Sequence, residues 1–85
     1  MNHFTRPSFW DFYAKLPTEI QILADKNYQL LKENPRHPSL QFKQIGRLWS
    51  VRITDNYRAL GLNSNVGIVW FWIGLHGEYE KLLKR

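Results

Sequence analysis

The chain has 85 residues and a mass of 10.2 kDa, so we expect a single domain that spans residues 1–85. Its apolar fraction of 44% is enough for a core, and the lack of cysteine excludes a disulfide framework, a cysteine-ligated zinc and a thiol nucleophile, which suits a reducing cytoplasm. The formal net charge of +5 favours an anionic partner, and a basic surface with no partner is the alternative.

We expect neither a signal peptide nor a membrane span. Residues 1–6 lack the apolar stretch that a signal peptide carries. The longest apolar run, Ile68–Ile73, is far shorter than the roughly 20 residues needed to cross a bilayer.

The first helix is predicted to begin next to Pro7, with Ser8 as its N-cap and Asp11 in its first turn. Apolar side chains at helical spacing continue to Leu16. Pro17 then interrupts the pattern, which makes the connection to the next helix a tight one.

The second helix is predicted to begin at a capping box formed by Thr18 and Gln21. Its apolar stripe consists of Ile20, Leu23, Ala24 and Leu31, with Tyr28 beside it. The dipeptide Asn34–Pro35 ends it, because the residue before a proline disfavours the helical conformation. The two helices should therefore form an antiparallel hairpin.

Beyond this hairpin the apolar spacing changes from about 3.6 residues to about 2, which indicates strands. Residues 36–39 are predicted as a loop, Phe42–Ile45 as a short strand and Gly46–Arg47 as a turn. In Leu48–Thr54 apolar and polar residues alternate, which is typical of a strand with one buried face.

A hairpin turn at Asp55–Asn56 leads to a predicted strand over Tyr57–Leu62, and Asn63–Asn65 turns the chain again. The run Ile68–Ile73 does not alternate, as expected of a central strand that is covered on both faces. We expect Gly74 to end this strand.

Residues His76–Lys84 are predicted to form a last helix, with Tyr79, Leu82 and Leu83 on one side. The predicted fold is therefore α+β: an N-terminal helical hairpin packed on an antiparallel sheet of three to four strands, with a short C-terminal helix.

Several kinds of catalytic site have no support in the sequence. The three histidines, His3, His37 and His76, do not have ligand spacing, so no metal site is expected. There is no serine elbow motif, no glycine-rich phosphate loop and no pair of carboxylates on the strands, so no cofactor is expected either.

What remains is a set of cationic and aromatic side chains on the sheet and the last helix. Arg52 and Arg58 lie on adjacent predicted strands, where a guanidinium suits a phosphate; an ion pair with Asp55 is the alternative for Arg58. Histidine side chains can exchange a proton near neutral pH, so His76 suits a general acid or base, unless it is a capping or surface residue. Tyr79 faces the same way, where it would stack on a base or position a phosphate.

This set matches the demands of RNA cleavage. The 2′-hydroxyl must be activated, the charge on the phosphorane stabilised and the leaving 5′ oxygen protonated; arginines suit the second task and histidine the first or third. Residues 34–60 carry five lysines and arginines against one aspartate. Of these, Lys43, Arg47 and Arg36 would add contacts to the RNA backbone. A passive RNA-binding surface would have the same residue types.

Two stretches resemble the RelE/ParE toxin superfamily of bacterial toxin–antitoxin systems. The family's paired strands, with a Tyr-Arg start to the second, are similar to Leu48–Leu60. Its last strand and C-terminal catalytic segment are similar to Val69–His76 followed by Glu78–Tyr79. The helical hairpin and His37–Leu40 also fit, so the resemblance covers nearly the whole chain.

The resemblance implies a toxin that cleaves mRNA on the ribosome or, in the ParE branch, inhibits DNA gyrase. The family's site positions carry over onto Arg58, Arg52, His76 and Tyr79. Ser50 and Thr54 stand where strong nucleases have lysines, so weak activity, or a non-toxic partner-binding module, is a further alternative.

The resemblance also implies a partner, an antitoxin encoded beside the toxin. The basic middle segment and the aromatic content of 15% predict a surface that an acidic, partly disordered antitoxin peptide covers.

Overall fold

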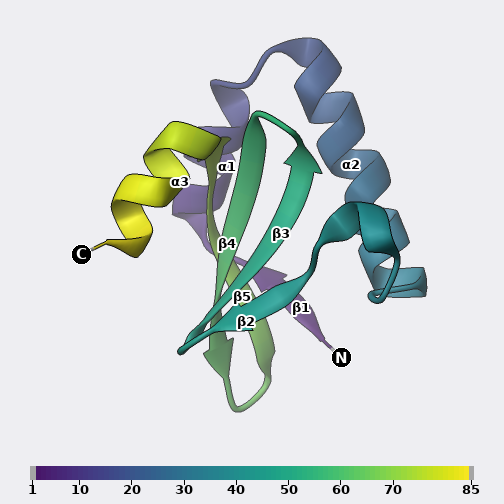
Figure 1. Ribbon diagram of the computed structural model, residues 1–85, viewed down its shortest axis with the longest axis vertical. Helices are drawn as coiled ribbons and strands as arrows, with labels where there is room; N and C mark the ends of the chain where they lie inside the picture. Colours follow the sequence, from purple (N-terminus) through teal and green to yellow (C-terminus); the bar gives the residue numbers. More distant parts are fainter. Residues whose placement is uncertain (1, 85) are drawn as a thin grey trace.

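The computed structural model describes residues 2–84, which form a five-stranded mixed sheet with three α-helices (Figure 1). In chain order the elements are β1 (His3–Thr5), α1 (Pro7–Ala14), α2 (Thr18–Glu33), the short 3-10 helix η1 (Pro38–Leu40), β2 (Lys43–Ile45), β3 (Leu48–Thr54), β4 (Tyr57–Ser64), β5 (Gly67–Leu75) and α3 (His76–Leu83). The predicted α+β class is confirmed, with two N-terminal helices before strands β2 to β5 and one helix after them.

The sheet has the strand order β1-β5-β4-β3-β2. Strands β2 to β5 pair antiparallel with one another, as the sequence predicted. The prediction missed the fifth strand, β1, which pairs parallel to β5 with His3 opposite Ile68. Three residues are too few to show a period of two, so only the pairing partner reveals this strand.

Both predicted helix caps are wrong. Helix α1 begins two residues earlier than a Ser8 cap implies, with Arg6 at the N-cap, so Ser8 lies inside the helix. Helix α2 has Pro17 at its N-cap and no side-chain cap, so Thr18 does not form a capping box. The side chain of Gln21 instead donates to the carbonyl of Tyr13, 3.0 Å away, and so ties α2 back to α1. The end of α2 at Asn34 is as predicted.

The structure of β5 explains why apolar and polar residues do not alternate along this strand. It continues past Gly74 to Leu75, so the predicted strand end is wrong by one residue. In its ladder with β4, Leu60 pairs with Trp72 and Gly61 pairs with Trp70, which leaves Phe71 as a bulged residue. A bulge inserts one residue and shifts the alternation of side chains between faces.

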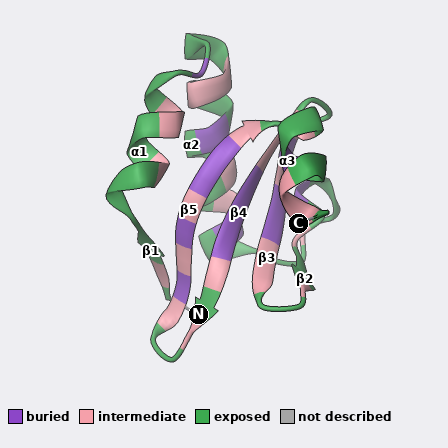
Figure 2. Ribbon diagram, turned by 90° about the vertical axis from the view of Figure 1, so that its left-hand side faces the viewer, coloured by how far each residue is buried: buried purple, intermediate pink, exposed green. Residues whose placement is uncertain are grey.

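This shift lets one strand supply aromatic side chains to two clusters. Trp70 belongs to the larger core cluster, which α2 covers with Ala24 and Leu31. Trp72 belongs to a smaller cluster with Leu60 and Tyr79 of α3. Figure 2 shows the buried bands of β3, β4 and β5 that these clusters form. The sheet is therefore covered on both faces, by α2 on one and α3 on the other.

A second bulge lies in β3, and a helix side chain satisfies the backbone at each bulge. Ile53 has no partner in the ladder with β4, and Asn27 of α2 donates to its carbonyl at 2.9 Å. At the other bulge, the Ser8 hydroxyl of α1 donates to the carbonyl of Phe71 at 3.2 Å. These two contacts tie α1 and α2 to the bulged positions of the sheet.

No helix between residues 2 and 84 combines the length and the apolar character that a membrane crossing requires.

The close packing of β4 on β5 gives a stability prediction. A Cβ atom at Gly61 would lie 2.5 Å from Cγ2 of Ile68 and 2.9 Å from Cε3 of Trp70. We therefore expect Gly61→Ala to lower the free energy of unfolding by about 1–3 kcal/mol, since overpacking displaces the core. Thermal unfolding followed by circular dichroism measures this as a fall in Tm.

The matched control is Gly77→Ala in α3, where a new Cβ would meet nothing within 4 Å. This change should raise the free energy of unfolding by about 0.5–1 kcal/mol, because alanine favours the helix. An unchanged Tm for Gly61→Ala would contradict the tight packing at the bulge.

Candidate functional site

A pocket of about 320 Å³ lies beside α3, and it gathers several of the predicted site residues. It is lined by Gln41, Lys43, Ile45, Ser50, Arg58, His76, Tyr79, Glu80 and Leu83. We call it the basic pocket. Arg58 and His76 therefore converge on one space, as a shared phosphodiester requires. Arg52, Arg47 and Arg36 do not line it.

The β3–β4 turn places both Arg58 and His76. The Nη1 atom of Arg58 donates to the carbonyl oxygens of Thr54 and Tyr57, the latter at 3.0 Å, so the half-buried side chain folds back on the turn. The backbone N–H of His76 donates to the carbonyl of Asn56 at 2.7 Å. Among residues 2–84 the Nη2 and Nε atoms of Arg58 have no hydrogen-bond partner, so these donors remain available to an anion.

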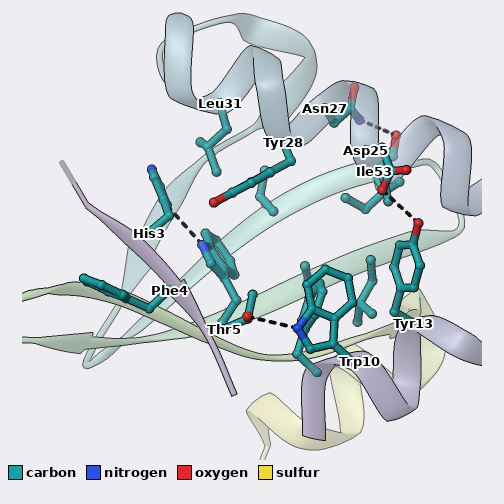
Figure 3. Close-up of a pocket in the computed structure, with 16 residues that line it drawn as sticks. His3, Phe4, Thr5, Trp10, Tyr13, Asp25, Asn27, Tyr28, Leu31 and Ile53 are labelled. Atoms are coloured by element: carbon teal, nitrogen blue, oxygen red, sulfur yellow. Dashed lines mark hydrogen bonds between the residues drawn. The ribbon is translucent and has the colours of Figure 1, made fainter. Parts of the chain in front are cut away.

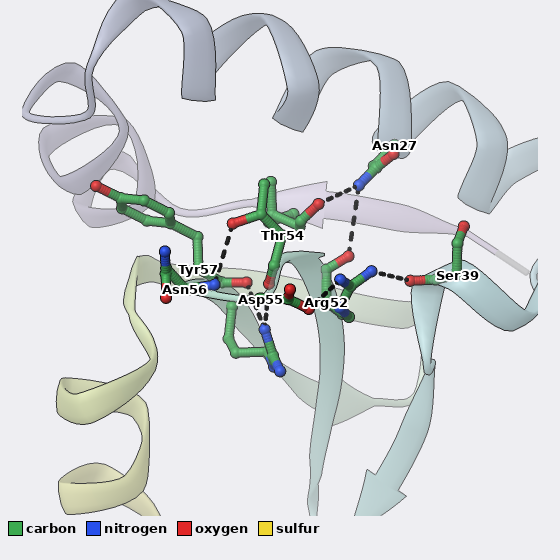
Figure 4. Close-up of polar contacts among 9 residues, drawn as sticks. Asn27, Ser39, Arg52, Thr54, Asp55, Asn56 and Tyr57 are labelled. Atoms are coloured by element: carbon green, nitrogen blue, oxygen red, sulfur yellow. Dashed lines mark hydrogen bonds and ion pairs between the residues drawn. The ribbon is translucent and has the colours of Figure 1, made fainter.

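Arg52 lies across the ladder from Arg58, and its charge is already paired (Figure 4). It donates to the Asp55 carboxylate and, at 3.3 Å, to the carbonyl of Ser39. The hydrogen bond and the charge of Arg52, with a smaller contribution from Arg58, hold the pKa of the Asp55 carboxyl below its usual value. The ion pair that we considered for Arg58 is thus made by Arg52.

His76 begins α3 and has two side-chain neighbours within that helix. Its ring stacks on Tyr79, with centroids 5.5 Å apart and an interplanar angle of 23°. Its Nε2 atom lies 3.2 Å from Oε1 of Glu80, and 42% of the His76 side chain is exposed. The ring is therefore both held and accessible.

Tyr79 is buried, with only 5% of its surface exposed. The Ser50 hydroxyl donates to the Tyr79 hydroxyl at 2.9 Å, which joins α3 to β3. A tyrosine in this position supports the His76 ring and leaves little surface for a nucleotide base. Ser50, which the sequence presented only as a missing lysine, is thus part of the support.

Of the three basic residues predicted to bind RNA, only Lys43 lines the basic pocket. Arg47 lies in the turn between β2 and β3, and Arg36 lies between α2 and η1; both are exposed. Sequence reasoning missed Glu80, although its spacing of four residues from His76 puts both on one helix face and was a usable signal.

A second pocket, of about 430 Å³, lies on the other face of the sheet (Figure 3). We call it the aromatic pocket. It is lined by His3, Phe4, Thr5, Phe9, Trp10, Tyr13, Ala24, Asp25, Asn27, Tyr28, Leu31, Val51, Ile53, Ala59, Trp70 and Ile73. Large apolar side chains at its rim stay open to solvent, with Trp10 51% and Phe4 45% exposed.

Polar contacts fix the walls of the aromatic pocket. The Tyr13 hydroxyl donates to the Asp25 carboxylate at 2.8 Å, joining α1 to α2. Partial burial, this hydrogen bond and the negative charge of Asp25 raise the pKa of the Tyr13 hydroxyl. The Trp10 indole donates to the Thr5 hydroxyl at 3.1 Å. The pocket is thus preformed and mostly apolar, as binding pockets commonly are.

Within residues 2–84, no three His, Asp or Glu side chains gather in a group that could hold a metal ion.

Comparison with solved structures finds the same fold at low sequence identity. A chain of the RelB–RelE antitoxin–toxin complex from Methanococcus jannaschii matches with a TM-score of 0.70 and 13% identity, covering 93% of this chain and 96% of that one. The YoeB/ParE toxin from Agrobacterium tumefaciens matches with a TM-score of 0.66 and 16% identity, covering 89% and 99%. The isolated RelE toxin from E. coli matches with a TM-score of 0.61 and 13% identity, covering 98% and 95%.

No family model matches the sequence, and no curated protein matches it. The chain has the fold of the RelE/ParE toxin superfamily, as the resemblance of its strands had implied.

His3, in the wall of the aromatic pocket, gives a pH prediction. The Trp70 indole, which can only donate, bonds to Nδ1 of His3 at 3.1 Å, so Nδ1 must be unprotonated. Burial lowers the pKa of His3, and the positive charges of the amino terminus and Lys32 lower it further. The folded state therefore disfavours imidazolium.

Stability should be full above about pH 6.5 and should fall as the pH drops below that value, because the unfolded state then binds the proton more readily. Urea unfolding at about pH 8 and about pH 5 measures the difference. His3→Asn keeps an acceptor and does not titrate, so it should reduce the pH dependence, whereas His37→Asn should preserve it. Equal pH dependence in wild type and His3→Asn would contradict this account.

Proposed function

We propose that the chain is the toxin of a type II toxin–antitoxin system and that it inhibits translation by cleaving mRNA on the ribosome. The observation that supports this proposal is the convergence of Arg58 and His76 on the basic pocket, with Lys43 beside them. The shared fold supports the toxin class.

The reaction follows from the groups present. Neutral His76 accepts the proton of the ribose 2′-hydroxyl, and that oxygen forms a bond to the adjacent phosphorus. The free donors of Arg58 bind the phosphoryl oxygens, whose negative charge grows in the transition state. The bond from phosphorus to the 5′ oxygen then breaks, that oxygen takes a proton from water, and the hydroxide left behind removes the proton from His76. The products are a 2′,3′-cyclic phosphate and a 5′-hydroxyl end.

The other predicted residues have supporting roles. Tyr79 acts through the His76 ring that it stacks on. Lys43, Arg47 and Arg36 contact the RNA backbone, which accounts for their exposure. Arg52, whose charge is paired with Asp55, holds that carboxylate in the turn next to Arg58.

The test is the loss of cleavage in Arg58→Ala. Purified protein is added to translating ribosomes, and cuts in the message are mapped by primer extension. We expect Arg58→Ala to lower the cleavage rate at least about 100-fold, since it removes the donors that stabilise the phosphorane. Arg58→Lys should recover part of the rate, because it restores the charge without the fork.

Lys26→Ala is the matched control, since Lys26 is an exposed cation on α2 and lies outside both pockets. It should cut at the wild-type rate. Absence of cuts by the wild type, or equal cutting by Arg58→Ala, rejects the nuclease. A gyrase supercoiling assay with the same proteins then separates a gyrase inhibitor from a non-toxic module.

We propose further that the partner is an antitoxin that inserts an apolar segment into the aromatic pocket. The structural match to the RelB–RelE antitoxin–toxin complex supports such a partner. The exposed Trp10 at the rim supports the aromatic pocket as the binding site, because large exposed aromatic side chains typically mark contact surfaces. The positively charged side chains on the other face remain for the acidic part of that peptide.

A small acidic protein encoded next to this gene should therefore bind the chain, as measured by calorimetry. Trp10→Ser should weaken that binding about tenfold or more, since it removes an aromatic anchor. Ile22→Ser is the matched control, because Ile22 is 62% exposed on α2 but does not line the aromatic pocket. Equal affinities of both variants would place the antitoxin elsewhere.

A further inference from the structure

We propose that Glu80 is a positioning residue for His76, so that the histidine and the carboxylate act as a pair when the 2′-hydroxyl loses its proton. This inference rests on the proposed function and goes beyond it, because neither the sequence pattern nor the fold assigns Glu80 a role. Both residues line the basic pocket.

The spacing of the pair decides which ring nitrogen is free. His76 and Glu80 are one helical turn apart, and Nε2 of the ring lies 3.2 Å from the carboxylate oxygen Oε1. A carboxylate can only accept, so it favours the tautomer with the proton on Nε2. The lone pair on Nδ1 is then available to take the proton of the 2′-hydroxyl.

Different residues contact the face and the edge of the His76 ring. Tyr79 stacks against the imidazole and is itself buried and bonded to Ser50. With Tyr79 against the ring face and Glu80 near Nε2, the orientation of His76 depends on one buried contact and one charged contact. Rings held in this way lose less entropy when the substrate binds.

The charge of Glu80 needs an explanation in a pocket that carries Arg58 and Lys43. A carboxylate there weakens the attraction of an anion, so phosphate binding alone does not account for it. It gains a function once Nδ1 takes the proton, because the ring becomes an imidazolium and the negative charge stabilises it, as in serine hydrolase triads.

The neighbouring Glu78 provides the matched control. It is on the same helix and exposed, its carboxylate lies 3.7 Å from Nζ of Lys81, and it does not line the basic pocket.

The catalytic test is a double-mutant cycle on ribosome-bound message with His76→Ala, Glu80→Ala and both changes together. Glu80→Ala should lower kcat about tenfold with KM unchanged, a fraction of what an acid–base residue contributes. In the His76→Ala background it should have no further effect. Glu80→Gln should fall between Glu80→Ala and wild type, since the amide oxygen keeps an acceptor near Nε2 without the negative charge. Glu78→Ala should match wild type. Additive losses in the cycle overturn the proposal.

A second measurement needs no RNA. Nitrogen-15 signals of the His76 ring, recorded by NMR, should move in Glu80→Ala and stay in place in Glu78→Ala. Unchanged ring signals in Glu80→Ala overturn the pairing whether or not the protein cuts mRNA. A wild type that cuts no mRNA while its ring signals respond to Glu80→Ala would reject the nuclease and leave the pairing in place.

Discussion

The fold depends on one constraint: a thin sheet in a short chain must be apolar on both faces. The bulge at Phe71 meets it, because it shifts the side-chain alternation within β5 and sends Trp70 and Trp72 to different clusters. At the two bulges, the side chains of Ser8 and Asn27 donate hydrogen bonds to the carbonyls of Phe71 and Ile53. The bulges in the sheet are thus also the places where α1 and α2 are bonded to it.

The candidate site has a similarly local origin. The β3–β4 turn receives the Arg58 side chain and the first backbone N–H of α3, so a four-residue segment sets the separation of the arginine and the histidine. The Ser50–Tyr79 hydrogen bond closes α3 onto β3 from the other side. A site supported from two strands and one helix holds its groups in place before a ligand arrives, which is what electrostatic catalysis requires.

The basic and aromatic pockets lie on opposite faces of the sheet, and this separation divides the two proposed activities. Cationic and titratable groups face α3, whereas exposed aromatic side chains gather between α1, α2 and β1. An antitoxin segment in the aromatic pocket would leave the basic pocket open, so inhibition would require further chain that reaches around the sheet. The surplus of positive charge in residues 34–60 provides a surface for such an acidic extension.

The sequence by itself determined the α+β class, the order of the helices and four of the five strands, because periodicity and turn residues act over a few neighbours, and it placed Arg58 just after a hairpin turn and His76 near the start of the last helix. Only the tertiary structure decided the rest. Strand β1 exists through its pairing with β5, Ser8 serves a bulge far along the chain instead of a cap, and Arg52 is paired with Asp55. Tyr79 became buried because packing partners are set by distances in the folded chain, which local patterns do not contain, whereas the spacing of Glu80 from His76 was visible in the sequence.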